Sequence, residues 1–179
     1  MACGFLYWKV AAGTSIRHES VDCIPTFQDG DGPYYISDAP FRDVLMPATA
    51  SGDVLKVSGT LYRNDCNTAV AGAVIDIWQA DDTGTYKSDW HRGRITTNKN
   101  GSYNFKTVMP GGYGEGTGYR PPHIHFKIWE HGVLRITSEM FFPEVRGRAG
   151  FADTYIIKLK SRTKLGKIEH EGYHDIILP

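Results

Sequence analysis

The 179-residue sequence is short of features that define two common classes of protein. Lysine plus arginine total 20 and aspartate plus glutamate total 20, so the chain lacks the basic surplus typical of nucleic-acid-binding domains. No apolar run approaches the roughly 20 residues of a membrane-spanning helix. The apolar run that begins at Phe5 is ended by Lys9, which makes it a poor signal-peptide core. We therefore expect neither a nucleic-acid nor a membrane partner.

Cysteine is also scarce. The three cysteines are an odd number and include no Cys-x-x-Cys spacing, so a thiolate zinc site is not expected. Count and spacing favour three unrelated thiols. The alternative at this level is a Cys23–Cys66 bridge with Cys3 left over.

Strand-like patterns are abundant. Alternating apolar and polar residues recur along the chain between short turns such as Asn100-Gly101. We expect strands at 54–62, 73–78, 94–97, 103–108, 120–129, 133–142, 154–159 and 173–178. This spacing predicts an all-β protein, a two-sheet β-sandwich. The predicted organisation is one domain over residues 21–179, preceded by an irregular arm at 1–20, with Trp78 and Phe105 in the core.

Two histidines one residue apart, His123 and His125, are the most informative feature of the chain. Residues i and i+2 of a strand face the same side, so both imidazoles project together, with Lys127 beyond them. The residues that alternate with these three face the core: Ile124, Phe126 and Ile128. Two imidazoles on a rigid strand supply half of a metal site. The pattern alone is more often incidental, so its weight depends on other residues.

A glycine-rich segment, 110–118, precedes this strand and contains Tyr113. It is not a phosphate-binding loop, because two prolines and a strand follow it where a helix should begin. Its glycines instead allow a tight bend that orients Tyr113. A second candidate tyrosine, Tyr86, ends the segment that begins at Trp78.

Five motifs in this part of the chain occur in a consistent order. They are residues 74–86, Arg92-Gly93, residues 101–107, Pro110-Gly-Gly-Tyr113 and Arg120-Pro-Pro-His-Ile-His-Phe126. Together they resemble the intradiol ring-cleavage dioxygenases, the family of catechol 1,2-dioxygenase and protocatechuate 3,4-dioxygenase. The resemblance covers roughly residues 23–142, and five motifs at compatible spacing are far more specific than any one.

The resemblance implies a non-haem Fe(III) held by Tyr86, Tyr113, His123 and His125, at the ends of loops and strands. Two phenolates are hard anionic donors that favour ferric iron, and imidazole suits iron too. The implied reaction cleaves a catechol with O2 between its hydroxylated carbons and gives a cis,cis-muconate. By position, Tyr113 would be the ligand displaced by catechol and Tyr86 the one retained. Arg120 matches an arginine beside the substrate, where it would stabilise charge on the ring.

The chain departs from the family at Glu139, where a glutamine is usual. A carboxylate there would repel anionic substrates or take up a proton, so Glu139 is a substrate-adjacent candidate. The segment 23–35 resembles stand-alone secreted members, which implies a Cys23–Cys66 disulfide and an extracellular setting, with the cytoplasm as the alternative. The helical dimerisation region of catechol 1,2-dioxygenases has no counterpart after Met1, so we expect a monomer or weak oligomer.

Two other interpretations compete with the iron enzyme. One is a non-catalytic sandwich that binds a ligand or partner, a use this architecture often serves. The other is a zinc or copper site on His123 and His125, although tyrosine is an unusual zinc ligand. The remaining histidines belong to no motif and are expected to be ordinary surface residues: His18, His91, His131, His170 and His174.

Overall fold

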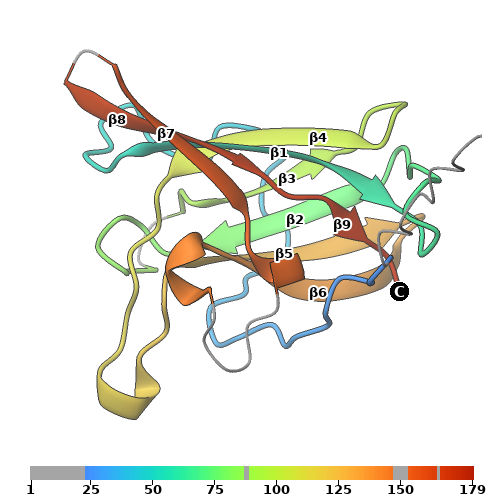
Figure 1. The fold of residues 1–179 in the computed structure, drawn as a ribbon, viewed down its shortest axis with the longest axis horizontal. Helices are drawn as coiled ribbons and strands as arrows, with labels where there is room; N and C mark the ends of the chain where they lie inside the picture. Colours follow the sequence, from blue (N-terminus) through green and yellow to red (C-terminus); the bar gives the residue numbers. More distant parts are fainter. Residues whose placement is uncertain (1–22, 87–88, 147–152, 165) are drawn as a thin grey trace, which may run out of the picture.

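The fold is a sandwich of two sheets (Figure 1), seen in a computed structural model that describes residues 23–86, 89–146, 153–164 and 166–179. Within these ranges the strands are β1 (Val54–Tyr62), β2 (Val74–Gln79), β3 (Arg92–Thr96), β4 (Ser102–Val108), β5 (His123–Glu130), β6 (Val133–Phe141), β7 (Lys158–Lys164), β8 (Lys167–Tyr173) and β9 (Ile176–Ile177). One sheet has the order β4-β1-β8-β7 with β9 also paired to β1, and the other has the order β3-β2-β5-β6. The predicted all-β sandwich is confirmed.

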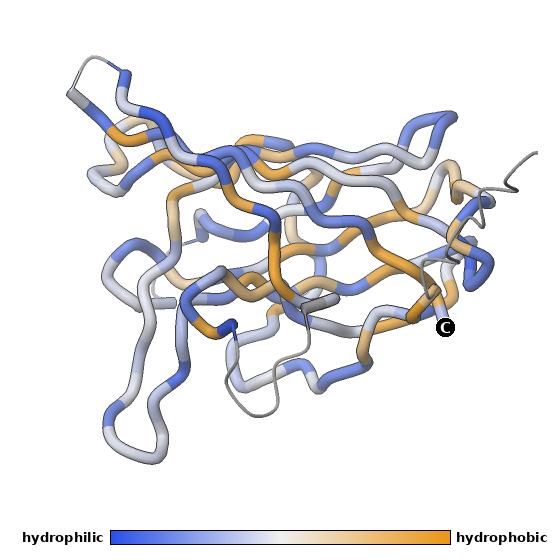
Figure 2. The backbone as a smooth tube through the Cα atoms, in the orientation of Figure 1, coloured by the Kyte–Doolittle hydropathy of each residue, from blue (hydrophilic) through white to orange (hydrophobic). Residues whose placement is uncertain are grey.

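The core lies between the two sheets, as the alternation along the strands requires. Figure 2 shows hydrophobic stretches along the central strands and hydrophilic residues on the outer loops. On β5, Ile124, Phe126 and Ile128 are fully buried in one cluster with residues of the opposite sheet such as Leu55 and Phe105. The predicted inward face of the histidine strand is therefore correct, and both histidines lie on the outer face of the β3-β2-β5-β6 sheet.

The C-terminal strands differ from the expected ones. Residues 154–159 were predicted as one strand, but Asp153–Tyr155 is a 3-10 helix and β7 begins only at Lys158. Residues 173–178 are divided between the end of β8 and the two-residue β9. The β7–β8 hairpin has mostly exposed, charged residues, so it shows little apolar alternation to mark its limits. Among the described residues, no helix has the length and apolar character needed to cross a membrane.

Two of the five histidines expected at the surface are buried. His91 is 7% exposed and His174 is 4% exposed, so the prediction was wrong for both. The His91 amide donates to the Leu45 carbonyl, and the His174 amide donates to the Ser58 carbonyl. Tertiary hydrogen bonds of this kind leave no pattern in the sequence. His18, Cys3 and the predicted arm at 1–20 lie outside the described residues.

Residues 23–45, which we call the covering segment, run from β9 over the outer face of the β3-β2-β5-β6 sheet to β3 and β4 (blue in Figure 1). The Asp29 amide donates to the Thr137 carbonyl of β6 at 2.8 Å. The Lys127 ammonium on β5 lies 2.7 Å from the Asp31 carboxylate. The predicted disulfide joins Cys23, at the start of this segment, to Cys66. The covering segment thus buries the sheet face that carries the two histidines.

Candidate metal centre

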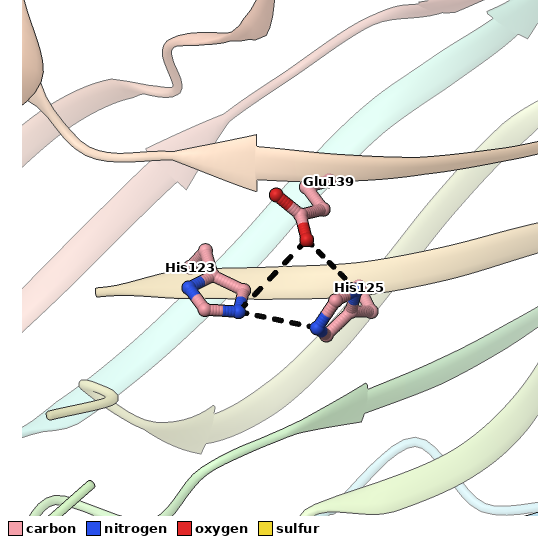
Figure 3. A group of neighbouring side chains, drawn as sticks. All are labelled: His123, His125 and Glu139. Carbon is pink, nitrogen blue, oxygen red and sulfur yellow. Dashed lines mark hydrogen bonds and ion pairs between the residues drawn. The ribbon is translucent and has the colours of Figure 1, made fainter. Parts of the chain in front are cut away.

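His123, His125 and Glu139 form a buried cluster on this outer face (Figure 3). Both histidines are on β5, and Glu139 lies opposite His125 in the register of β6. The two histidine Nε2 atoms are 3.1 Å apart. Glu139 Oε1 lies 3.2 Å from His125 Nδ1 and 4.0 Å from His123 Nε2. The prediction that the two histidines share one face is correct, and the pairing of β5 with β6 places the Glu139 carboxylate beside them.

The two imidazoles are suited to binding a metal. Burial lowers the pKa of His123 to about 4, and burial together with the neighbouring His123 lowers the pKa of His125 to about 3. Both rings are therefore neutral near pH 7, which is the form in which imidazole coordinates a cation.

The two candidate tyrosines lie beside the histidines. The ring of Tyr113 is 5.6 Å from that of His123, and the ring of Tyr86 meets Tyr113 edge-on at 5.7 Å. Burial raises the pKa of both phenols, and for Tyr86 the neighbouring Tyr113 raises it further. The Tyr86 hydroxyl is buried, and the Tyr113 hydroxyl is the neighbouring hydrogen-bonding group. A nearby cation would favour the phenolate form of either side chain.

Glycines bring the two tyrosine-bearing loops into contact. Gly84 has φ +79°, and a Cβ there would lie 2.3 Å from the carbonyl oxygen of Gly112. A Cβ on Gly111 would lie 2.6 Å from the Asp81 carbonyl oxygen. The Asp81 side chain also accepts hydrogen bonds from the amides of Thr83 and Thr85. The Tyr86 loop is therefore held by its own turn, and the Tyr113 loop packs against it.

Arg120 connects the Tyr113 loop to the buried carboxylate. Its backbone pairs with that of Tyr113 through two hydrogen bonds of 3.0 and 2.8 Å. Its Nη2 lies 2.5 and 2.7 Å from the two carboxylate oxygens of Glu139. Burial raises the pKa of Glu139 to about 7, while Arg120 acts in the opposite direction. The two residues predicted to lie near a substrate are thus in direct contact with each other.

Three residues around the cluster were not predicted as part of a site. Trp78 was expected in the core, and it is buried, but it lies on the outer face, stacked on His125 with the ring centroids 4.9 Å apart. Tyr34 stacks on Tyr86 with a centroid distance of 4.2 Å. Gly32 packs over His125, where a Cβ would lie 3.3 Å from the ring carbon Cε1. Only the pairing of β2 with β5 and the path of the covering segment reveal these neighbours.

The donor geometry fits a metal ion. Two metal–ligand bonds of about 2.1 Å at a right angle place their donor atoms about 3 Å apart. The 3.1 Å between the two Nε2 atoms matches that separation. The buried Tyr86 hydroxyl supplies an oxygen donor in the same cluster of rings. The residues present therefore suit a cation bound by nitrogen and oxygen.

The fold and this cluster define a β-sandwich with a candidate metal centre on a covered sheet face. The model of a dioxygenase family (Dioxygenase_C) matches residues 30–165. The chain belongs to this family, the intradiol ring-cleavage dioxygenases. Its members act on catechol-type substrates with O2 and typically use non-haem Fe(III).

Several relatives support this membership. The chlorocatechol 1,2-dioxygenase of Pseudomonas putida is 32% identical over 135 residues, covering 62% of this chain and 51% of the relative. The hydroxyquinol 1,2-dioxygenase of a Rhizobium strain is 30% identical over 141 residues, covering 63% and 46%. The chain thus spans about half the length of the curated relatives it matches.

Solved structures give the same fold. The dioxygenase domain of a dioxygenase–carbohydrate-binding fusion from Streptomyces sp. SirexAA-E is 29% identical with a TM-score of 0.72, covering 87% of this chain and 98% of that one. An intradiol ring-cleavage dioxygenase from Tetranychus urticae has a TM-score of 0.70 at 23% identity, covering 87% and 95%. The second likeness concerns the fold alone.

Proposed function

We propose that this protein is an Fe(III)-dependent intradiol dioxygenase that cleaves a catechol-type diol with O2 to a cis,cis-muconate-type product. The observation that carries the proposal is the series of neighbouring rings from Tyr86 through Tyr113 and His123 to His125, in a chain of this family. Two phenolates and two imidazoles are the donor types that favour ferric iron.

In this proposal Tyr86, Tyr113, His123 and His125 would hold the iron, which would supply the chemistry that makes a catechol reactive toward O2. Tyr113 would be the displaceable ligand, and its Oη would accept a proton from a catechol hydroxyl. Because burial raises the pKa of Tyr113, the released phenolate is a good proton acceptor. Arg120 stabilises negative charge that develops on the ring.

The proposed setting is extracellular or luminal, because the Cys23–Cys66 disulfide is of the kind that persists in oxidising compartments. The proposed substrates are a small catechol and O2. The proposed assembly is a monomer or weak oligomer.

The test is an iron-loaded preparation assayed with catechol. We expect a burgundy-red protein with a tyrosinate-to-Fe(III) absorption band, and equimolar consumption of O2 and catechol with muconate formation. Removing the iron with a chelator should abolish both the colour and the turnover, and returning Fe(III) should restore them. A red iron protein that consumes no O2 with any catechol would contradict the proposed activity.

One observation favours a second candidate. Glu139 Oε1 lies near both histidines, and two histidines with one carboxylate form a known ligand set for non-haem Fe(II) and for catalytic zinc. A protein using only these three ligands would be colourless with zinc. It would also keep its metal when both Tyr86 and Tyr113 are replaced by phenylalanine, whereas the ferric site we propose would not.

A further inference from the structure

We propose that Glu139 is a positioning residue of the metal centre, whose carboxylate orients His125 and, through Arg120, the Tyr113 loop. The inference rests on the metal site of the proposed function, but it does not depend on which reaction the metal performs. Glu139 is suited to this role because it contacts two elements that carry predicted ligands, β5 and the loop ahead of it.

The hydrogen bond of His123 fixes which of its nitrogens is available. His123 Nδ1 lies 2.6 Å from the Pro121 carbonyl oxygen, which can only accept a hydrogen bond. Nδ1 therefore carries the proton in the neutral ring, and Nε2 presents a lone pair. That Nε2 faces the Nε2 of His125 at 3.1 Å.

The same reasoning places Glu139 outside the first coordination shell. Glu139 Oε1 faces the opposite nitrogen of His125, at 3.2 Å from Nδ1, and that buried nitrogen makes no hydrogen bond of regular geometry with any described residue. A carboxylate next to Nδ1 stabilises its proton and leaves Nε2 free beside His123. Carboxylates that hold metal-binding histidines in this way fix the tautomer and strengthen the ligand.

Arg120 extends this contact to the Tyr113 loop. Both Glu139 oxygens lie within 2.7 Å of Arg120 Nη2, and the Arg120 backbone pairs with that of Tyr113. Glu139 is 4% exposed, and a buried carboxylate needs such partners to offset its lost hydration. One side chain of β6 therefore links His125 of β5 to the base of the Tyr113 loop.

The experiment compares Glu139→Gln and Glu139→Ala with the wild-type protein in chelator competition for Fe(III). Replacing a residue that holds a metal-binding histidine typically lowers metal affinity by roughly 10- to 100-fold, and we expect this range for Glu139→Ala. Glutamine keeps an oxygen dipole beside His125 Nδ1 but loses the charge, so Glu139→Gln should lose less affinity. Weaker donation by His125 leaves the iron more electron-poor, so the tyrosinate absorption band should shift to longer wavelength in both variants.

Glu130→Gln is the matched control. Glu130 also lies on the four-stranded sheet, at the far end of β5, where its carboxylate pairs with Arg63. Replacing it removes a similar ion pair without touching the cluster. We expect Glu130→Gln to change the unfolding midpoint at most, and to leave iron affinity and the absorption band unchanged. A purely structural role for Glu139 would give the same result in Glu139→Gln.

Three outcomes decide the inference. Wild-type iron affinity and an unshifted band in Glu139→Gln would overturn it. Complete loss of metal in Glu139→Gln, with metal retained in Tyr86→Phe and Tyr113→Phe, would also overturn it and make Glu139 a direct ligand. The expected graded loss with a shifted band supports it. If the wild-type protein binds iron and shows the band but cleaves no catechol, the proposed activity fails while this test still applies.

Discussion

Tyr86 and Tyr113 are both tyrosines, but the backbone around Tyr86 is held more firmly than the backbone that follows Tyr113. The turn before Tyr86 is held by the Asp81 carboxylate, which accepts hydrogen bonds from two backbone amides. Beyond Tyr113 the loop has positive φ at Gly114 and Gly116, a backbone region that glycine enters at little cost. Tyr113 is therefore the tyrosine better able to change position when a catechol arrives.

We predict different losses for two ligand substitutions. Tyr113→Phe should retain iron more readily than His123→Ala, because His123 is fixed in a strand beside its partner and Tyr113 is the displaceable ligand. Tyr113→Phe should nevertheless bind catechol slowly and turn over at least ~10²-fold more slowly, since a proton acceptor is lost. Iron per chain, stopped-flow catechol binding and O2 uptake measure these effects. Fast catechol binding in Tyr113→Phe but slow binding in Tyr86→Phe would reverse the assignment.

At this scale the sequence predicted the histidine pair but not its environment. The alternation of His123 and His125 with apolar residues places both rings on one face, and this follows from local backbone geometry. The contact between Glu139 and His125 depends on the register of β6 against β5. That register is set by tertiary packing, so the sequence pointed to Glu139 only through the family resemblance.

The covering segment is the element that closes the histidine face. Its Gly32 has φ +64° and lies over His125, where a Cβ would come within 3.3 Å of the ring. Gly30, two residues earlier, has an ordinary φ, and a Cβ there would meet no atom within 4 Å. Gly32 and Gly30 therefore provide a test substitution and its matched control only two residues apart.

We predict that Gly32→Ala destabilises the protein and loosens the metal site, while Gly30→Ala does neither. A side chain at positive φ costs about 1–2 kcal/mol, and the new methyl group would press on His125. Gly30→Ala should stay within about 0.5 kcal/mol of wild type. Urea unfolding gives the free energies, and chelator competition gives the iron affinity. Equal behaviour of the two variants would show that the covering segment does not restrain His125.

Elements with an apolar face were the ones that sequence could define. Strand β1 was predicted with its observed limits, because its buried positions alternate with polar ones. The limits of the β7–β8 hairpin were not predicted from the sequence, because both strands are largely exposed and show no pattern of burial. The covering segment was not recognised as an element of the site, since it has no regular secondary structure and is fixed by contacts with other strands.

For the molecule as a whole, a disulfide anchors the N-terminal end of the covering segment to the sandwich. The Cys23–Cys66 disulfide closes a loop with a sequence separation of 43 residues and lies at the start of the covering segment. The number and spacing of the cysteines did not predict this pairing. Only the resemblance of residues 23–35 to secreted family members favoured it. The covering segment is therefore fully anchored only where the disulfide can form, which is the oxidising setting proposed for this protein.

We predict that replacing Cys23 and Cys66 together by serine lowers the free energy of unfolding by about 2–4 kcal/mol, since the unfolded chain is no longer restrained by the cross-link. The variant should also release iron faster, because one end of the segment over His125 is freed. Cys3→Ser is the control and should leave both properties unchanged. Urea unfolding and chelator-driven iron release measure them without thiol reductants, which would reduce ferric iron. Three alkylatable thiols in the unreduced wild-type protein, with identical unfolding of the double variant, would show that the bond does not form in solution.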